Sequence, residues 1–164
     1  MHEHELRRGR SVERPYAKVK AIIEQDALGL FQRATTATAM HAGPLEATLH
    51  VDVAGHDLHR DVRVEITSVD RSGRPPSAMA LPGFAVAFRW HAAAAPSLFP
   101  SMRAQLTIYP LSAEETQVDF HGWYRPPAGV IGAMADGIDH HRSAEASVER
   151  FVEDIVRRLA AEAA

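Results

Sequence analysis

The chain has 164 residues, of which 46% are hydrophobic and 24% are charged, a composition that fits one globular domain spanning residues 1–164. Its formal net charge is −3, so it lacks the broad positive field with which proteins bind nucleic acid or an anionic membrane surface. It contains no cysteine, which excludes disulfides, thiolate metal sites and cysteine nucleophiles.

The start of the chain is charged and carries no apolar segment, and the longest apolar runs fall far short of the ~20 residues of a membrane span. We therefore expect a cytoplasmic protein without membrane insertion. His2 and His4 are expected to belong to a flexible tail and are given no role.

A first strand is predicted over residues 5–13, although its alternation is poor because arginines separate Leu6 from Val12. Pro15 suits the first position of a helix, and apolar residues at helical spacing extend that helix over 15–24. Asp26 can cap a second helical segment over 27–34, which Gly29 weakens. The pattern predicts a short, bent pair of helices.

From residue 45 the hydrophobic period changes to two, which predicts antiparallel strands near 49–53 and 62–66 joined by a tight turn at 54–57. Residues 70–77 form a turn-rich interval expected at the surface. Three further strands are predicted around Phe84 to Trp90, Leu106 to Ile108 and Val118 to Tyr124. Residues 91–100 should be a loop because prolines bound them, and 111–115 should be the last hairpin turn.

The last helical segment has two different halves. In the second half, apolar residues at three- and four-residue spacing predict a face that docks on the sheet: Val148, Phe151, Val152, Ile155 and Leu159. The first half, 129–141, is rich in glycine and alanine, and its larger side chains Met134, Ile138 and His141 share one face that they fill thinly.

The residues from Phe120 to Gly132 read F-H-G-W-Y-R-P-P-A-G-V-I-G, a strand followed by a proline elbow and a long helix. This order resembles the SRPBCC superfamily, whose START-like members include lipid carriers and polyketide cyclase/dehydratase-like proteins. The resemblance implies an α+β helix-grip fold: a curved antiparallel sheet wrapped around a long C-terminal helix, with two short N-terminal helices and an enclosed hydrophobic pocket.

The sequence departs from this family in the number of strands, because six can be placed where seven are usual, and the first is unusually basic. Either residues 35–40 form the missing strand or the sheet is trimmed at one edge. The second case would leave the pocket more open.

Aromatic residues on one face of the sheet, opposite a thin helix face, predict unfilled apolar volume. The predicted ligand-binding residues are Phe84, Phe88, Trp90, Phe120, Tyr124, Met134, Ile138 and His141. Tyr124 and His141 are also the candidate catalytic groups. The pair Asp136 and His140 lacks a third ligand, so we predict neither a metal site nor a cofactor.

These observations favour a domain that binds a small hydrophobic or amphipathic molecule without transforming it. One alternative is a cyclase or dehydratase type of enzyme in which Tyr124 and His141 orient a carbonyl group. Another is an interaction domain whose loop, 92–99, docks a partner or a second copy. The identity of the ligand and the oligomeric state are left open by the sequence.

Overall fold

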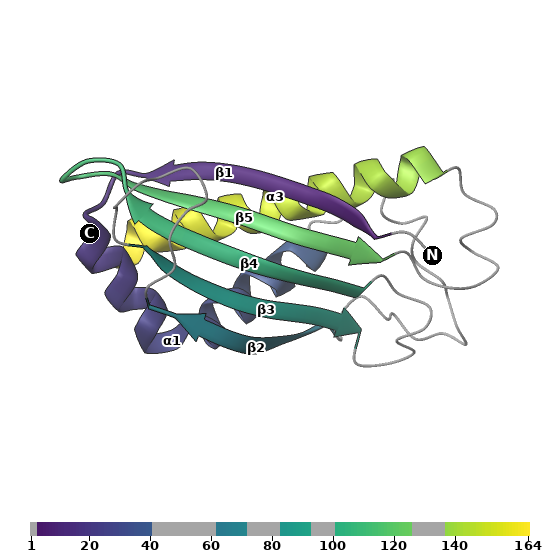
Figure 1. Ribbon diagram of the computed structural model, residues 1–164, viewed down its shortest axis with the longest axis horizontal. Coiled ribbons are helices and arrows are strands. Elements are labelled where there is room, and N and C mark those ends of the chain that lie inside the picture. Colours follow the sequence, from purple (N-terminus) through teal and green to yellow (C-terminus); the bar gives the residue numbers. More distant parts are fainter. Residues whose placement is uncertain (1–2, 41–61, 72–82, 93–100, 126–136) are drawn as a thin grey trace.

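The computed structural model describes residues 3–40, 62–71, 83–92, 101–125 and 137–164. Within these ranges it contains one antiparallel sheet and two helices (Figure 1). The strands are β1 (His4–Val12), β2 (Val62–Asp70), β3 (Phe84–Ala92), β4 (Ser101–Pro110) and β5 (Thr116–Arg125), arranged in the order β1-β5-β4-β3-β2. The helices are α1 (Tyr16–Met40) and α3 (Gly137–Glu162).

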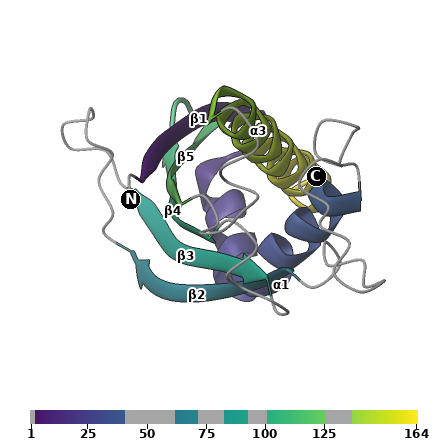
Figure 2. The same ribbon diagram turned by 90° about the vertical axis from the view of Figure 1, so that its right-hand side faces the viewer.

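Figure 2 shows that the sheet curves and that both helices lie on its concave side. Helix α3 contacts α1 and the edge strand β1 far more than it contacts β5. The helix therefore lies along one edge of the curved sheet, and α1 covers the concave side toward the opposite edge. The predicted α+β helix-grip architecture is confirmed.

The predicted break between the N-terminal helical segments is confirmed at Asp26, where the backbone leaves the helical conformation (φ −152°, ψ 58°). Its Oδ1 accepts the backbone N–H of Gly29 at 2.9 Å, as an N-cap does for the helix that follows. A side chain on residue 29 would collide with the Asp26 carboxylate, which explains a glycine within this turn. The second segment continues to Met40, so the prediction that it ends near residue 34 is wrong.

Residues 35–40 are helical, so the hypothesis that they form a seventh strand is wrong. His4 lies in β1, so the expectation that it belongs to a flexible tail is also wrong. The predicted turn at 111–115 is confirmed, since the backbone N–H groups of Leu111 and Ser112 both donate to the Glu115 carbonyl oxygen. The strand predicted at 49–53, the turn at 54–57 and the elbow after Arg125 lie outside the described residues.

The concave face carries the apolar half of each strand's alternation, as in β5, where every second residue from Thr116 to Tyr124 is buried. In β4 the inward positions from Met102 to Ile108 are buried in the same way. The docking face predicted for the last helix is confirmed, because all five of its residues from Val148 to Leu159 are at most 1% exposed. Their burial holds α3 in place.

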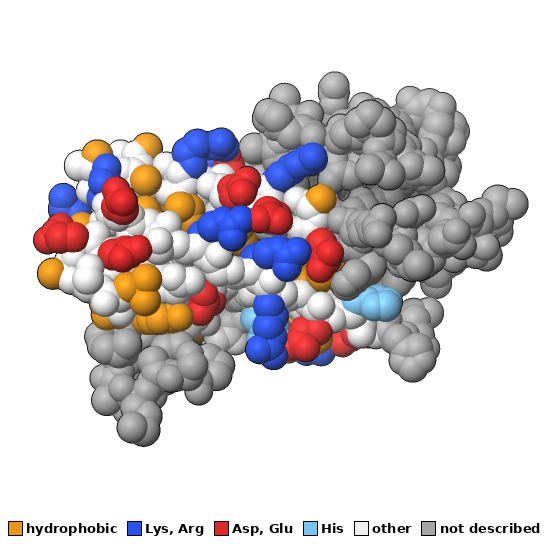
Figure 3. Space-filling view, turned by 90° about the horizontal axis from the view of Figure 1, so that it is seen from above, with side chains coloured by type: hydrophobic (Ala, Val, Ile, Leu, Met, Phe, Trp, Pro, Cys, Tyr) orange, Lys and Arg blue, Asp and Glu red, His pale blue; other side chains and the backbone are white. Residues whose placement is uncertain are grey.

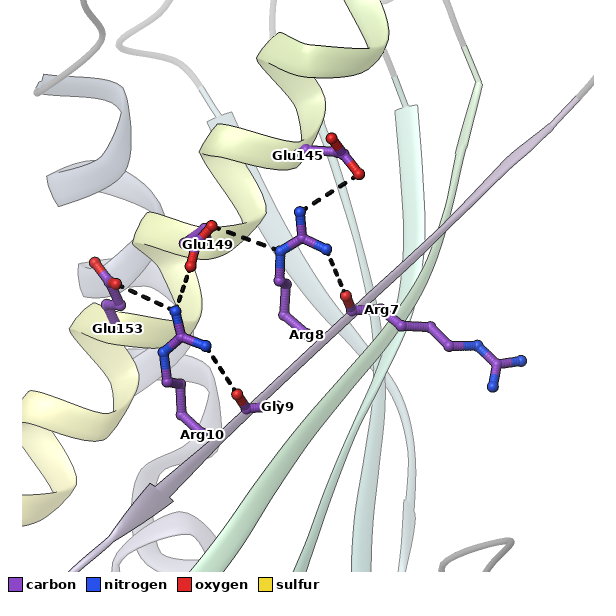
Figure 4. Close-up of polar contacts among 7 residues, drawn as sticks. All are labelled: Arg7, Arg8, Gly9, Arg10, Glu145, Glu149 and Glu153. Carbon is purple, nitrogen blue, oxygen red and sulfur yellow. Dashed lines mark hydrogen bonds and ion pairs between the residues drawn. The ribbon is translucent and has the colours of Figure 1, made fainter.

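The edge strand β1 departs from this rule, because its two inward positions between Leu6 and Val12 are arginines. Arg8 contacts Glu145 at 3.4 Å and Glu149 at 3.7 Å, and Arg10 contacts Glu149 and, at 3.5 Å, Glu153 (Figure 4). The three glutamates repeat every four residues and so face β1 together. We call these five residues the ionic seam.

The same arginines also cover the edge of the sheet. The Arg8 guanidinium donates to the Arg7 carbonyl oxygen at 2.7 Å, and that of Arg10 donates to the Gly9 carbonyl oxygen at 3.0 Å. Basic and acidic side chains alternate across the face of the molecule that includes β1 and α3 (Figure 3). Inward-pointing charges of this kind blunt an edge strand against pairing with another chain.

Candidate functional site

Aromatic rings fill the concave face from its middle toward the end of the sheet where β4 turns into β5. Phe88 lies 4.6 Å from Phe31 and 5.7 Å from Phe151, measured between ring centroids. Phe120 lies 6.3 Å from Phe88 and 6.0 Å from Phe151. All four side chains are at most 1% exposed, as is that of Phe84. At this end the sheet and both helices share one closed hydrophobic core.

The filled region reaches Gly122, the inward residue between Phe120 and Tyr124. A Cβ at this position would lie 2.6 Å from Cε1 of Phe120 and 3.3 Å from the sulfur of Met102. The Phe120 ring therefore lies against bare backbone, which only glycine allows. Beyond this ring, toward the end of β5, the composition of the concave face changes.

A single row of paired positions crosses all five described strands at that end. The register aligns His4 with Tyr124, Tyr124 with Met102, Met102 with Trp90 and Trp90 with Val64. We call these five positions the Tyr124 row. They lie on the concave side of the sheet by the alternation of their strands, and they include a histidine, a tyrosine and a methionine.

Tyr124 is the polar group that this arrangement buries most completely. Its side chain is 3% exposed, and burial raises the pKa of its phenol above the ordinary value. Its hydroxyl has no hydrogen bond to any described residue. In the described part of the chain, Arg14 Nε is the one side-chain nitrogen or oxygen that is both fully enclosed and unpaired. The Tyr124 oxygen is therefore not fully enclosed. A buried, unpaired donor that still reaches open space can bind a ligand.

Of the predicted site residues, the structure brings Phe88 and Phe120 into contact and places Tyr124 beyond them. Trp90 is at the register position next to Met102, although its side chain lies outside the described part. Ile138 and His141 belong to the first turns of α3, which begin at the same end of the molecule as the end of β5 (Figure 1). Their side chains, and the whole of Met134, lie outside the described part.

Sequence reasoning did not assign three members of this row to the site: Val64, Met102 and His4. Met102 could have been found by extending the alternation of Leu106 and Ile108 back by two inward positions. His4 could have been found by extending the alternation of Val12 and Leu6 back by one inward position. Arg8 and Arg10, which lie between Leu6 and Val12, hid that alternation.

No protein-family model matches the chain, and no curated protein matches its sequence. Solved structures do match. The Zhui aromatase/cyclase from Streptomyces sp. R1128 is similar over 99% of this chain and 94% of its own, with 16% identity and a TM-score of 0.50. A hypothetical protein from Helicobacter pylori is similar over 94% of this chain and 87% of its own, with 9% identity and a TM-score of 0.50.

The chain has the helix-grip fold. At these low identities the likeness extends to the fold alone, and the fold that the resemblance implied is confirmed. The helix-grip domain thus carries a closed aromatic core across the middle of its concave face and the Tyr124 row beside it, at one end.

A separate pocket of about 190 Å³ lies at the bend of α1, against the end of α3. It is lined by Ile22, Gln25, Asp26, Leu30, Arg33 and Glu162. Arg33 contacts Asp26 at 3.2 Å and Glu162 at 4.0 Å, so its charge is already paired. Ligand sites for small molecules usually measure roughly 300–1,000 Å³, and this pocket lies outside the predicted site.

The convex face of the helix-grip domain is a charged surface. His121 lies 2.5 Å from Glu5, and its ring centroid is 4.1 Å from that of Trp123. Among the described residues no group of three or more His, Asp or Glu side chains could hold a metal ion. The helices in the described ranges include none with the length and apolar character needed to cross a membrane.

Proposed function

We propose that this helix-grip domain binds a small hydrophobic or amphipathic molecule on the concave face of its sheet, at the Tyr124 row. The observation that carries the proposal is the buried Tyr124 hydroxyl without a hydrogen-bond partner in the described part of the chain. Because its oxygen still reaches open space, the hydroxyl can bond to water in the absence of a ligand. A ligand that covers it without supplying an acceptor would leave the donor unpaired at a cost of ~1–3 kcal/mol, so a ligand with an acceptor is favoured.

The aromatic core supports this location rather than the other end of the sheet. Phe31, Phe88, Phe120 and Phe151 lie against one another there and use the space between sheet and helices. The residues proposed to contact the ligand are therefore Tyr124, Trp90, Met134, Ile138 and His141, with Met102 added from the structure. Phe88 and Phe120 would form the floor of the site, whereas Phe84 pairs with Ile108 toward the opposite end of the sheet.

The chemistry of Tyr124 limits what the ligand can be. A phenol is already protonated at neutral pH at its ordinary pKa of ~10, and burial raises the pKa of Tyr124 further, so the hydroxyl can donate a hydrogen bond. The proposed ligand is an apolar body that carries at least one acceptor oxygen, such as a carbonyl, hydroxyl or ether.

Thermal unfolding with a panel of fatty acids, sterols and aromatic polyketides tests the proposal. A ligand present at 100 times its dissociation constant should add ~2.7 kcal/mol to the stability of the protein. Tyr124→Phe should weaken that shift for oxygen-bearing ligands. Tyr109→Phe is the matched control, because Tyr109 is bonded to Asp119 outside the concave face. A panel that leaves the unfolding temperature unchanged throughout would contradict the proposal.

The same hydroxyl favours a second candidate, an enzyme of the cyclase or dehydratase type, in which Tyr124 holds a carbonyl oxygen of a polyketide. The similar Streptomyces protein is an aromatase/cyclase, which favours cyclisation of a polyketide as the first reaction to assay. Turnover of such a substrate that falls in Tyr124→Phe but not in Tyr109→Phe would support this candidate. Binding without turnover would support the function of ligand binding without catalysis.

A further inference from the structure

His4 stands directly opposite Tyr124 in the pairing of β1 with β5. The two ring centroids are 5.9 Å apart and the ring planes are inclined by 36°, so the imidazole lies beside the phenol. Along β1 the buried residues Leu6 and Val12 occupy the same parity as His4. The concave face of β1 therefore begins with this histidine.

The position of the pair links solvent to the interior. His4 is exposed, whereas the Tyr124 side chain next to it is 3% exposed. The neighbouring carboxylates of β1 face the other way: Glu3 contacts Arg103 and Arg125, and Glu5 contacts Arg7 and His121, all on the convex face. These contacts fix the face of the strand on which His4 lies.

The two rings offer complementary groups for one polar substituent. Tyr124 donates through its hydroxyl, and a neutral imidazole carries one N–H donor and one acceptor nitrogen. A carbonyl oxygen has two lone pairs and can accept from both side chains at once. A purely apolar ligand would leave the buried Tyr124 donor unpaired.

We propose that His4 is a second polar residue of the Tyr124 site, and that the two residues together select ligands that present a carbonyl oxygen at the edge of a flat apolar body. This inference rests on the proposed function, because it assigns the polar end of the same ligand site. His4 lies at the solvent side of that end and Tyr124 at the interior side.

Two probes that differ by the carbonyl group alone test this proposal: 2-acetylnaphthalene and 2-ethylnaphthalene. Their dissociation constants would be measured by isothermal titration for the unmodified protein, Tyr124→Phe, His4→Phe and His4→Gln. His121→Phe is the control, since it changes a histidine on the convex face. His4→Gln keeps a donor and an acceptor, and His4→Phe keeps only a ring.

The unmodified protein should prefer the acetyl probe by about fivefold, the ratio that corresponds to a net hydrogen bond of ~1 kcal/mol. His4→Phe should reduce this preference at least by half while leaving the affinity for the ethyl probe unchanged. His4→Gln should retain the preference, as should His121→Phe. Unfolding temperatures measured alongside would separate a binding effect from loss of structure.

The outcomes distinguish this inference from the proposed function. If both probes bind and His4→Phe leaves the preference for the acetyl probe intact, His4 has no part in recognition while the site itself stands. If neither probe binds to the unmodified protein, the inference and the proposed site are both overturned. Equal weakening of both probes in His4→Phe would assign His4 to packing, against the inference.

Discussion

The ionic seam predicts that the docking of α3 depends on salt. Replacing Arg8 and Arg10 by alanine removes every contact of the seam and leaves three glutamates at four-residue spacing on one helix face. The loss should therefore combine missing attraction between strand and helix with repulsion along the helix.

The size of the effect follows from exposure. The seam side chains are between 27% and 55% exposed, and exposed ion pairs contribute ~0.2–1 kcal/mol each. Four such contacts, two of them sharing Glu149, should contribute about 1.5 kcal/mol in total at low salt. In a domain of this size that corresponds to a decrease of about 3–6 °C in the unfolding temperature.

Circular dichroism melting at low salt and at about 1 M sodium chloride would measure the decrease. At the higher concentration the screening length is ~3 Å, so less than half of the decrease should remain. Replacing the two arginines by methionine keeps an apolar stem and removes the charge. That variant should lose the salt dependence and keep most of the stability at high salt.

Arg89→Ala is a matched control, because Arg89 contacts Glu65 at 2.9 Å on the convex face and holds no helix. It should change the unfolding temperature less than the double variant at low salt. An equal decrease for Arg8→Ala/Arg10→Ala at both salt concentrations would refute the reasoning, because the arginine stems and not their charges would then hold α3.

Two further predictions concern the core and the convex face. Phe151→Ala should cost ~3–5 kcal/mol in urea unfolding, because its ring contacts three others in the aromatic core, and a cost below ~1 kcal/mol would contradict that packing. Burial, and to a smaller extent the hydrogen bond to Asp119, raises the pKa of Tyr109 to about 12. The contribution of the Tyr109 phenol to the free energy of unfolding should be complete below pH ~10 and lost as the pH rises through about 12. Tyr109→Phe should therefore flatten the dependence of stability on pH in this range. An identical pH dependence in the variant would count against the prediction.

The sequence predicted those elements whose pattern is set by local periodicity. The strand ending in Tyr124 alternates strictly, and the helix from Val148 to Leu159 presents one apolar face, so both were identified before any contact was known. Asp26 was identified as a cap because a carboxylate before a helical pattern satisfies its first N–H groups.

Prediction from the sequence failed where the role of a residue depends on a partner far away in the chain. Arg8 and Arg10 occupy inward positions of a strand, where apolar residues are expected. Their role is explained by Glu145, Glu149 and Glu153 of α3, which lie beside them in the structure. Residues 35–40 continue α1, although their threonines favour a strand by propensity alone.

The candidate site, like the fold, was predicted only in part from the sequence. The sequence by itself determined which residues share one face within a strictly alternating strand such as the one that ends in Tyr124, because alternation fixes the side on which each residue lies. Only the tertiary structure decided that Phe88 and Phe120 close against Phe31 and Phe151, that Tyr124 remains without a partner among the described residues, and that His4 stands beside it. Strand register and helix docking set these contacts, and both depend on residues more than a hundred positions apart in the chain.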